Sequence, residues 1–493
     1  MATPNVLVLL CDQLAARVLG CYGGPVPTAN LDRIAESGVA FADATCPTPV
    51  CSPSRASVEL GSYPHAHGIR SNVGRRDVPA SSNPPTQEGI KADDPTLGRL
   101  LADAGYDTHH YGKWHLGDDD LPYFPDPFGP HKEYAQSMAD RFREVRARPR
   151  EAWMDWKGWA LPVEQSPEYR DAIAAADWEY PDWGPSNFLR KMGRLELDPQ
   201  ETFDVQVADR AVERVGQAPE PFYVVASFNW PHDPNVVPDP YYGEFDPRDI
   251  ALPDSYGDCE RRFADEPSRR VVEDFGEAGV REFLRIYYGT VSLLDEQVGR
   301  LLDALDERGV AEDTVVVFAA DHGDMTGGHG MVWKGTTAFY EEVVRVPLLV
   351  RGPGVAPRGT VDAPAGLTDL APTLLEFAGV SVPDSYQGHS LVPFLRGDSE
   401  AGPRTFTFAE RVASNDLENR TVYRDPLPGS FMVRGEGWKY ARYPDEEFLY
   451  DLAADPGETA DLSGDPAHAD RLERMRAELG AWLDRTDYPG DPL

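Results

Sequence analysis

The chain has 493 residues, 41% of them hydrophobic, which is enough to bury a sizeable core in one large domain plus a smaller one, or in three average domains. Its 83 acidic residues outnumber its 47 basic ones, and the net charge is −36. A field of this sign repels nucleic acids and anionic lipids, so neither is expected as a partner, and an anionic substrate would need basic groups concentrated at its site.

The first predicted element is a strand at Asn5–Leu10, a continuous apolar run of the kind that is buried on both faces of a parallel sheet. No apolar run approaches the ~20 residues of a membrane span. The apolar residues 5–11 follow Met1-Ala2-Thr3-Pro4 without a basic region or a cleavage site. We therefore expect a cytoplasmic chain as given, or a periplasmic or secreted one if a leader has been removed.

Helices and strands then alternate along the chain. Pro53–Leu60 is predicted to be a short helix with proline at its first position and Ser52 as its N-cap. The other predicted elements are helices at Pro27–Gly38, Pro95–Gly105, 202–216 and 278–307, and strands at Tyr106–Tyr111, Phe222–Phe228 and Thr314–Ala320. This alternation predicts an α/β fold, in which a large, mostly parallel sheet is sandwiched by helices.

Two regions depart from this alternation. Residues 118–200 form an insertion that holds five of the ten tryptophans, namely Trp153, Trp156, Trp159, Trp178 and Trp183. These aromatic rings either contact a sugar or a choline-like cation, or pack the insertion onto the domain. Beyond Pro383–Arg396, short strands at Thr405–Ala409, Phe431–Val433 and Trp438–Ala441 and a helix at 467–485 predict a small α+β subdomain. We therefore expect a catalytic domain over 1–385 and a C-terminal subdomain over 386–493.

The five cysteines are Cys11, Cys21, Cys46, Cys51 and Cys259. Their number is odd, and no pair has zinc-like or redox-motif spacing, so free thiols are favoured over a structural disulfide. Cys51 differs from the others because it opens the sequence Cys51-Ser52-Pro53-Ser54-Arg55, directly before a predicted helix. The dipole of that helix favours negative charge at Cys51.

Acidic and basic residues follow the apolar strands. Asp12 ends the first strand, Asp321 and His322 follow Thr314–Ala320, and these positions are where open α/β sheets place their ligands. Two carboxylates with a histidine suit a hard divalent cation, either Ca²⁺ or Mn²⁺. Lys113, His115, His232 and Lys334 supply positive or donor groups that suit a sulfate or a phosphate.

Together these segments resemble the type I sulfatases of the alkaline-phosphatase-like superfamily. Cys51 to Arg55 is similar to the Cys-X-Pro-X-Arg signature of that family, and the matches continue in family order with Asp12-Gln13, Gly112 to Gly117, Pro231-His232 and Asp321 to Asp324. Leu449 to Leu452, followed by Asp455-Pro456, also matches. A departure is Glu59-Leu60-Gly61, where the family usually has Leu-Thr-Gly.

The resemblance implies that a maturation enzyme oxidises Cys51 to formylglycine, an aldehyde. One hydroxyl of its hydrate, bound to a metal held by Asp12, Cys51, Asp321 and His322, would attack the sulfur of the ester, and the second hydroxyl would expel sulfate. Arg55 would hold the hydrate and the carboxylates, and His115 would orient the hydrate. Lys113, His232 and Lys334 would contact the sulfate, with His232 also able to protonate the leaving oxygen.

Further candidates line the leaving-group pocket in this interpretation: Arg70, Asn72, Asp324 and His329, with His65 and His67 at its flank. Each of them could equally be a structural loop residue. The function predicted from the sequence is hydrolysis of a sulfate ester of a sulfated carbohydrate or small organosulfate. The alternatives are a phosphonate monoester or phosphodiester hydrolase on the same fold, and a non-catalytic binder of sulfated glycans.

Overall fold

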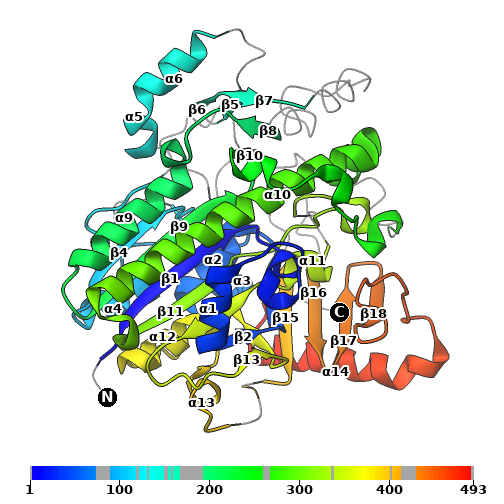
Figure 1. Ribbon diagram of the computed structural model, residues 1–493. Coiled ribbons are helices and arrows are strands. Elements are labelled where there is room, and N and C mark those ends of the chain that lie inside the picture. Colours follow the sequence, from blue (N-terminus) through cyan, green and yellow to red (C-terminus); the bar gives the residue numbers. More distant parts are fainter. Residues whose placement is uncertain are drawn as a thin grey trace.

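The computed structural model describes residues 3–73, 89–117, 121–129, 133–148, 154–156, 159–166, 192–258, 267–334, 338–399, 402, 404–411 and 429–489. Its centre is a seven-stranded sheet with the strand order β13-β2-β12-β11-β1-β9-β4 (Figure 1). The bounds of these strands are Gly359–Val361, Val39–Phe41, Leu348–Arg351, Thr314–Ala320, Asn5–Asp12, Phe222–Pro231 and Asp107–Gly112. Strand β12 runs antiparallel to both of its neighbours and the remaining pairs are parallel, so the prediction of a mostly parallel sheet is confirmed.

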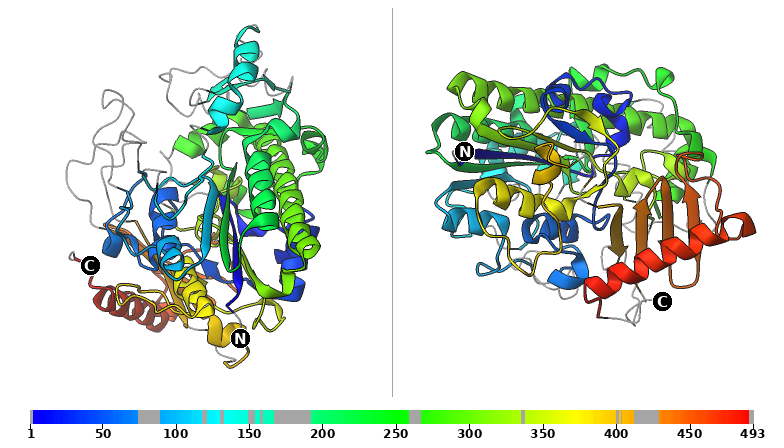
Figure 2. Two further views of the ribbon diagram at one scale, coloured as in Figure 1. Left: turned by 90° about the vertical axis from the view of Figure 1, so that its left-hand side faces the viewer. Right: turned by 90° about the horizontal axis from the view of Figure 1, so that it is seen from below.

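Helices cover both faces of this sheet (Figure 2). Along β1, alternate residues enter two separate hydrophobic cores: Leu7 and Leu9 face one, while Val6 and Val8 face the other. The first core is covered by α1 (Ala29–Ser37), α9 (Phe203–Gln217) and α10 (Pro267–Arg308). The second is covered by α2 (Cys51–Leu60), α4 (Leu97–Asp103) and α12 (Leu370–Ala378). This period-two division is what a strand buried on both faces requires.

The smaller elements of the main body flank the large sheet. They are β3 (Ala44–Thr45) paired with β14 (Ala365–Gly366), and the short helices α3 (Pro64–His67), α11 (Glu341–Val344) and α13 (Val392–Leu395). Among the ranges described, no helix is both long and apolar enough to cross a membrane.

The insertion lies at one end of the molecule (Figure 1). Its described elements are α5 (Ala135–Ser137), α6 (Ala139–Arg146), β5 (Met154–Trp156), β6 (Trp159–Leu161), β7 (Val163–Glu164) and β8 (Met192–Leu195). Strand β8 pairs with β10 (Asn235–Pro238), which joins the insertion to the segment that follows β9. The side chains of Trp153, Trp156, Trp159, Trp178 and Trp183 lie outside the part of the structure that is described.

The C-terminal region forms a four-stranded antiparallel sheet of β15 (Phe406–Arg411), β16 (Ser430–Gly435), β17 (Trp438–Arg442) and β18 (Glu447–Asp451). Helix α14 (Ala469–Arg485) crosses one face of this sheet (Figure 2). The predicted sheet-and-helix architecture is confirmed, and β18 is a strand that the sequence interpretation did not include. The sheet contacts the main body at β3, where the hydroxyls of Thr45 and Thr407 lie 2.9 Å apart.

Candidate active site and metal centre

The candidate site lies at the carboxyl ends of four neighbouring strands. Strands β11, β1, β9 and β4 are adjacent and parallel, so the residues that end or follow them meet at one edge of the sheet. Asp12 is the last residue of β1, and Asp321, His232 and Lys113 directly follow β11, β9 and β4. The sheet thereby gathers residues that are more than 300 positions apart in the chain.

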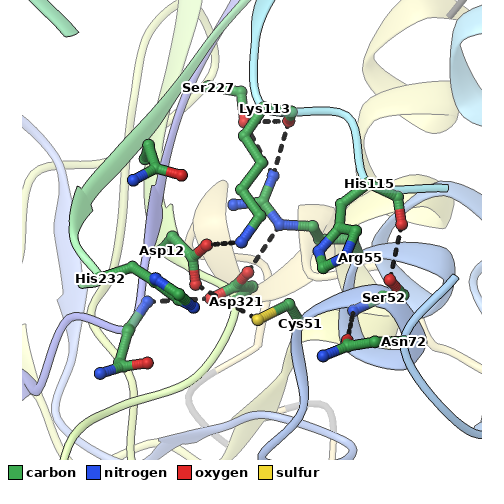
Figure 3. Close-up of polar contacts among 12 residues, drawn as sticks. Asp12, Cys51, Ser52, Arg55, Asn72, Lys113, His115, Ser227, His232 and Asp321 are labelled. Carbon is green, nitrogen blue, oxygen red and sulfur yellow. Dashed lines mark hydrogen bonds and ion pairs between the residues drawn. The ribbon is translucent and has the colours of Figure 1, made fainter. Parts of the chain in front are cut away.

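A cluster of four possible metal ligands occupies this edge (Figure 3). One ligand atom from each of Asp12, Cys51, Asp321 and His322 lies within 4.8 Å of all the others, and all four side chains are fully buried. Cys51 Sγ is 3.2 Å from His322 Nε2 and 3.5 Å from Asp12 Oδ1. The four residues predicted from the sequence as ligands therefore converge on one point.

The tautomer of His322 is set by its second ring nitrogen. Nδ1 lies 2.8 Å from the carbonyl oxygen of Gly323, which can only accept, so Nδ1 carries the proton and Nε2 presents its lone pair to the cluster. Burial lowers the pKa of His322 to about 3, so the imidazole is neutral over the physiological range. A neutral imidazole with its Nε2 directed at two carboxylates is in the form that binds a metal.

Asp321 is held in its charged form by its neighbours. Burial alone would raise its pKa, but the charges of Arg55 and Lys113 and the hydrogen bond from Gln13 N–H lower it to about 2. The strongest of these partners, Arg55, donates from Nε to Asp321 Oδ2 over 2.6 Å, and the two side chains are 2% and 0% exposed. Arg55 thus keeps this carboxylate of the candidate metal cluster ionised and fixes one of its oxygens.

Lys113 contacts the cluster from the end of β4. Its Nζ pairs with Asp12 Oδ2, and its carbonyl oxygen accepts hydrogen bonds from Arg55 and from Ser227. Close packing of β4 against β9 makes this possible, because Gly112 has φ +103° and a Cβ there would lie 1.9 Å from the carbonyl oxygen of Ser227. Only glycine satisfies both the dihedral angle and the close approach.

His232 and Lys334 form a second basic group beside the cluster. Lys334 Nζ lies 3.1 Å from His232 Nε2, and His232 Nδ1 lies 2.8 Å from the carbonyl oxygen of Asp233. Burial lowers the pKa of His232 to about 4, Asp233 opposes this shift, and the charges of Lys334 and Lys113 add to it. The imidazole is therefore neutral with its proton on Nδ1, and the ammonium of Lys334 carries the positive charge of the pair.

The helix that presents Cys51 begins two residues earlier than the sequence predicted. Helix α2 starts at Cys51 with Val50 as its N-cap, so Ser52 is not the N-cap and Pro53 is the third helical residue. Proline fits there because the first N–H groups of a helix have no partner within the helix. The Ser52 hydroxyl instead donates to the His115 carbonyl oxygen and accepts from Val73 N–H, and Asn72 Oδ1 accepts from Ser52 N–H.

The comparisons with known proteins agree with this geometry. The family model described as Sulfatase matches residues 4–380. This chain belongs to the sulfatase family. A second model, described as N-sulphoglucosamine sulphohydrolase, C-terminal, matches residues 327–484. The predicted family membership and the predicted class of enzyme, a sulfuric ester hydrolase, are thereby confirmed.

Individual relatives extend over nearly the whole sulfatase chain. It is 28% identical to a Delta 4,5-hexuronate-2-O-sulfatase of Bacteroides thetaiotaomicron, over 98% of this chain and 90% of that protein. It is 29% identical to a choline-sulfatase of Rhizobium meliloti, over 94% of this chain and 83% of that protein. Among solved structures, a phosphonate monoester hydrolase of Agrobacterium radiobacter superposes with a TM-score of 0.74 at 24% identity, covering 98% and 96% of the two chains. The last match shows the shared alkaline-phosphatase-like fold.

The remaining predicted residues fall into two groups. Figure 3 shows His115 on the same side of Cys51 as Lys113, close to the cluster. His65 lies instead at the junction with the C-terminal region, where its ring contacts Glu410 at 2.6 Å and the Thr486 carbonyl oxygen at 3.0 Å. His67 contacts Ser57 at 3.0 Å; burial lowers its pKa to about 3, and the charges of His65 and Arg70 add to the shift. These contacts give His65 and His67 structural roles.

Asp324 and His329 also have structural partners. Asp324 accepts hydrogen bonds from the side chain of Gln13 and from the backbone N–H groups of Thr326 and Trp333, so it fixes the loop after β11. The ring of His329 is stacked on Tyr340 with centroids 3.6 Å apart. Both residues therefore stabilise the loop that follows β11.

Two residues that the sequence interpretation missed support the site. Ser227, a serine within the largely apolar strand β9, accepts from Arg55 over 2.8 Å and donates to the Lys113 carbonyl oxygen over 2.6 Å. Asp204, in the first turn of α9, accepts from the N–H groups of Asn229 and Trp230 just before His232. A polar residue within an apolar run is the signal that could have identified Ser227, whereas Asp204 occupies an ordinary helix-start position.

The free thiols predicted for the chain are confirmed for Cys11, Cys21, Cys46 and Cys51, and Cys259 lies outside the described residues.

Proposed function

We propose that this chain hydrolyses a sulfate ester to an alcohol and inorganic sulfate through a formylglycine made from Cys51. The observation that carries the proposal is the position of Cys51 Sγ, at the first residue of α2 and 3.2 Å from the lone pair of His322 Nε2, inside a cluster of otherwise hard ligands. A thiol is a poor ligand for a hard cation. If Cys51 is converted to an oxygen donor, all four candidate ligands suit a hard divalent cation.

The residues of the cluster fit one divalent ion, Ca²⁺ or Mn²⁺. Asp12 and Asp321 supply carboxylate oxygens, and His322 supplies a neutral nitrogen. Next to Asp12, Gln13 also has a buried side-chain oxygen that no donor among the described residues reaches. Such an ion would neutralise the charge of the carboxylates and lower the pKa of an oxygen ligand.

The basic residues account for binding of the transferred group. Formylglycine at position 51 would provide, as its hydrate, a hydroxyl that attacks sulfur and a second hydroxyl whose deprotonation expels sulfate. Lys113 is paired with Asp12 of the cluster, and Lys334 contacts His232, so each of these two segments brings an ammonium group to the site. Preorganised charges of this kind stabilise the transition state, and loss of one donor costs roughly 3 kcal/mol.

His232 and Lys334 are the residues proposed to act on the leaving oxygen. In the geometry described, Lys334 donates to the neutral His232, so the pair holds an ammonium proton beside the anion site. His232 either relays that proton to the leaving oxygen or holds a sulfate oxygen. Arg55, His115 and Asn72 keep the helix start and the carboxylates in place, and Arg70 remains a candidate for contact with the alcohol part of the substrate.

The substrate class that we propose is a sulfated carbohydrate or a small organosulfate. The relatives named as a Delta 4,5-hexuronate-2-O-sulfatase and a choline-sulfatase support these two chemistries. The resemblance to a phosphonate monoester hydrolase supports the fold alone, so phosphoryl esters serve as the comparison substrates in the test.

The test requires the chain produced together with a formylglycine-generating enzyme, which we propose as its maturation partner, and supplied with Ca²⁺ or Mn²⁺. Intact mass should be lower than that of the unmodified chain by about 18 Da, the difference between thiol and aldehyde. Incubation with sulfated monosaccharides and choline sulfate should release inorganic sulfate, and kcat/KM should be higher for these than for matched phosphate and phosphonate esters.

The matched control uses two cysteines. Cys51→Ala should abolish sulfate release, while Cys21→Ala, remote from the cluster, should leave it intact. Release that survives Cys51→Ala would refute the aldehyde mechanism, and a preference for phosphonate esters would reassign the reaction. A chain that binds sulfated glycans but never acquires the aldehyde would be a non-catalytic binder.

A further inference from the structure

Trp333 has a backbone conformation that is rare for a bulky residue. Its φ is +60°, in the left-handed region that disfavours residues with a large side chain. Two hydrogen bonds impose this conformation: Trp333 N–H donates to Asp324 Oδ1 over 3.1 Å, and the Trp333 carbonyl oxygen accepts from Met325 N–H over 2.7 Å. Strain of this kind persists where the surroundings fix it, and it concentrates at functional sites.

The indole of Trp333 is bonded to the segment that follows His232. Its Nε1–H donates to Asn235 Oδ1 over 3.1 Å, and Asn235 lies three residues after His232. On the other side, the next residue in the chain is Lys334, whose Nζ lies 3.1 Å from His232 Nε2. The ring is therefore tied to both segments that hold the second basic group.

The indole is only partly buried, although the residues that hold it are not exposed. One part of Trp333 packs against the hydrophobic core beneath α10, and the residue as a whole remains partly exposed, whereas Asn235 is 5% exposed. Because Nε1 is occupied by Asn235, the orientation of the ring is fixed and its accessible part offers apolar surface. A rigid aromatic surface next to the proposed sulfate site would be placed to contact the group from which the sulfate is cleaved.

We propose that Trp333 is a specificity residue that stacks against the pyranose ring carrying the sulfate. The proposal rests on the sulfate ester hydrolysis argued above and names the part of the substrate that this residue reads. A sugar ring has an apolar C–H face that fits an aromatic side chain. A quaternary ammonium group also binds aromatic faces, but here it would lie beside the ammonium of Lys334, and the repulsion disfavours it.

The insertion contributes to this contact indirectly. Asn235 belongs to β10, and it is paired in register with Met192 of β8, at the end of the insertion. The position of the acceptor that orients the indole therefore depends on a strand of the insertion. This makes the insertion a support for the specificity residue as well as an appended unit.

The experiment measures binding by calorimetry in the metal-loaded Cys51→Ala chain, which does not turn over substrate. The ligands are inorganic sulfate, choline sulfate, and the 2-O-, 3-O- or 6-O-sulfated monosaccharide that the active chain hydrolyses with the lowest KM. Trp333→Ala should weaken binding of the sulfated monosaccharide about tenfold and leave binding of inorganic sulfate within about twofold, because sulfate alone has no ring. As a control, Trp438→Ala replaces a partly exposed tryptophan of β17 and should change the affinity for neither ligand.

The comparison separates a contact role from a structural one. Equal weakening of the binding of sulfate and of the saccharide would mean that Trp333 only positions Lys334, which would overturn the proposal. An unchanged affinity for the saccharide would overturn it too. Greater loss for choline sulfate than for the saccharide would assign the ring to a cationic leaving group instead. Trp333→Gly, which adopts φ +60° without strain, repeats the test in a chain whose loop geometry is preserved.

Failure of this proposal is distinguishable from failure of the proposed function. If the matured wild-type chain releases sulfate from choline sulfate but from no saccharide, sulfate ester hydrolysis stands and the assignment of Trp333 to a sugar fails. If it releases sulfate from no ester, the proposed function fails and this inference fails with it.

Discussion

Asp204 should make the stability of the fold depend on pH in a defined direction. The side chain is 1% exposed, and its Oδ1 accepts the N–H groups of Asn229 and Trp230, ahead of His232. Burial raises the pKa of Asp204 from 3.8 to about 7, although the two backbone hydrogen bonds and the charge of Lys113 oppose the shift. Because the pKa in the folded state is the higher one, the contribution to stability is complete below pH 4 and is lost as the pH rises through 7.

The magnitude follows from the size of the shift. A shift of about three pKa units at 1.36 kcal/mol per unit corresponds to about 4 kcal/mol between pH 4 and pH 8. At ~2.1 cal/mol/K per residue, the unfolding entropy of a chain of this length is about 1 kcal/mol/K, so the melting temperature should change by about 4 °C.

Asp204→Asn isolates this contribution. Asparagine accepts the same two N–H groups and does not ionise. Melting temperatures of the wild type and of Asp204→Asn, measured from pH 4 to pH 9, should coincide near pH 4 and diverge above it until the variant melts about 4 °C higher. Other titrating groups cancel in the difference between the curves. Parallel curves of melting temperature against pH, or an Asp204→Asn variant that is less stable than the wild type at pH 8, would refute the reasoning. Asp204→Ala should be destabilised at every pH, because it leaves both N–H groups without an acceptor.

Three further outcomes are expected. Lys439 is fully buried, 2.8 Å from Glu341 and 2.7 Å from Glu458, and burial raises the pKa of Glu458 to about 8. At pH 9, above this pKa, Lys439→Met should lower the free energy of unfolding by about 3–5 kcal/mol, as measured by thermal unfolding. A change in melting temperature below 1 °C would contradict this expectation. A chelator should lower the melting temperature of the wild type and barely affect Asp12→Asn, since a ligand stabilises only the fold that binds it; equal shifts would argue against the cluster as the metal site. Arg55→Lys keeps the charge but loses the planar guanidinium that reaches both Asp321 and the end of β4. In a sulfate-release assay, kcat/KM should therefore fall roughly a hundredfold. Near-normal activity would show that the charge alone suffices.

Much of the sheet could be predicted because its strands are continuous apolar runs. Strand β11 has the predicted bounds, and α9 begins and ends within one residue of them. The convergence of the candidate metal ligands could be predicted as well, since residues that end parallel strands meet at one edge whatever their separation in the chain. For Asp12, Asp321 and His322 the pattern of strand ends was sufficient, and for Cys51 the family motif was needed.

The features that could not be predicted depend on contacts that leave no local pattern. The start of α2 moved to Cys51 because Val50 is extended and its carbonyl oxygen accepts from Ser54 N–H, a bond that no single-residue preference specifies. His65 resembled a site residue because histidine is common in sites, yet its partners come from the distant C-terminal region. The left-handed conformation of Trp333 is likewise imposed by contacts that leave no local pattern: its N–H donates to Asp324, and its carbonyl oxygen accepts from Met325 N–H. These bonds oppose the preference of tryptophan itself.

The segment from Asp321 to Val344 connects the separate parts of the molecule. It begins with two candidate ligands, Asp321 and His322, and its middle holds Lys334 against His232. Its end is fixed by the C-terminal sheet, where the buried Lys439 of β17 donates to the Phe339 carbonyl oxygen and pairs with Glu341 at the start of α11. A segment anchored at both ends can hold a lysine and a strained tryptophan between them at low conformational cost. The C-terminal sheet therefore supports the proposed site from a distance, because it fixes the far end of the loop whose near end carries two of the candidate metal ligands.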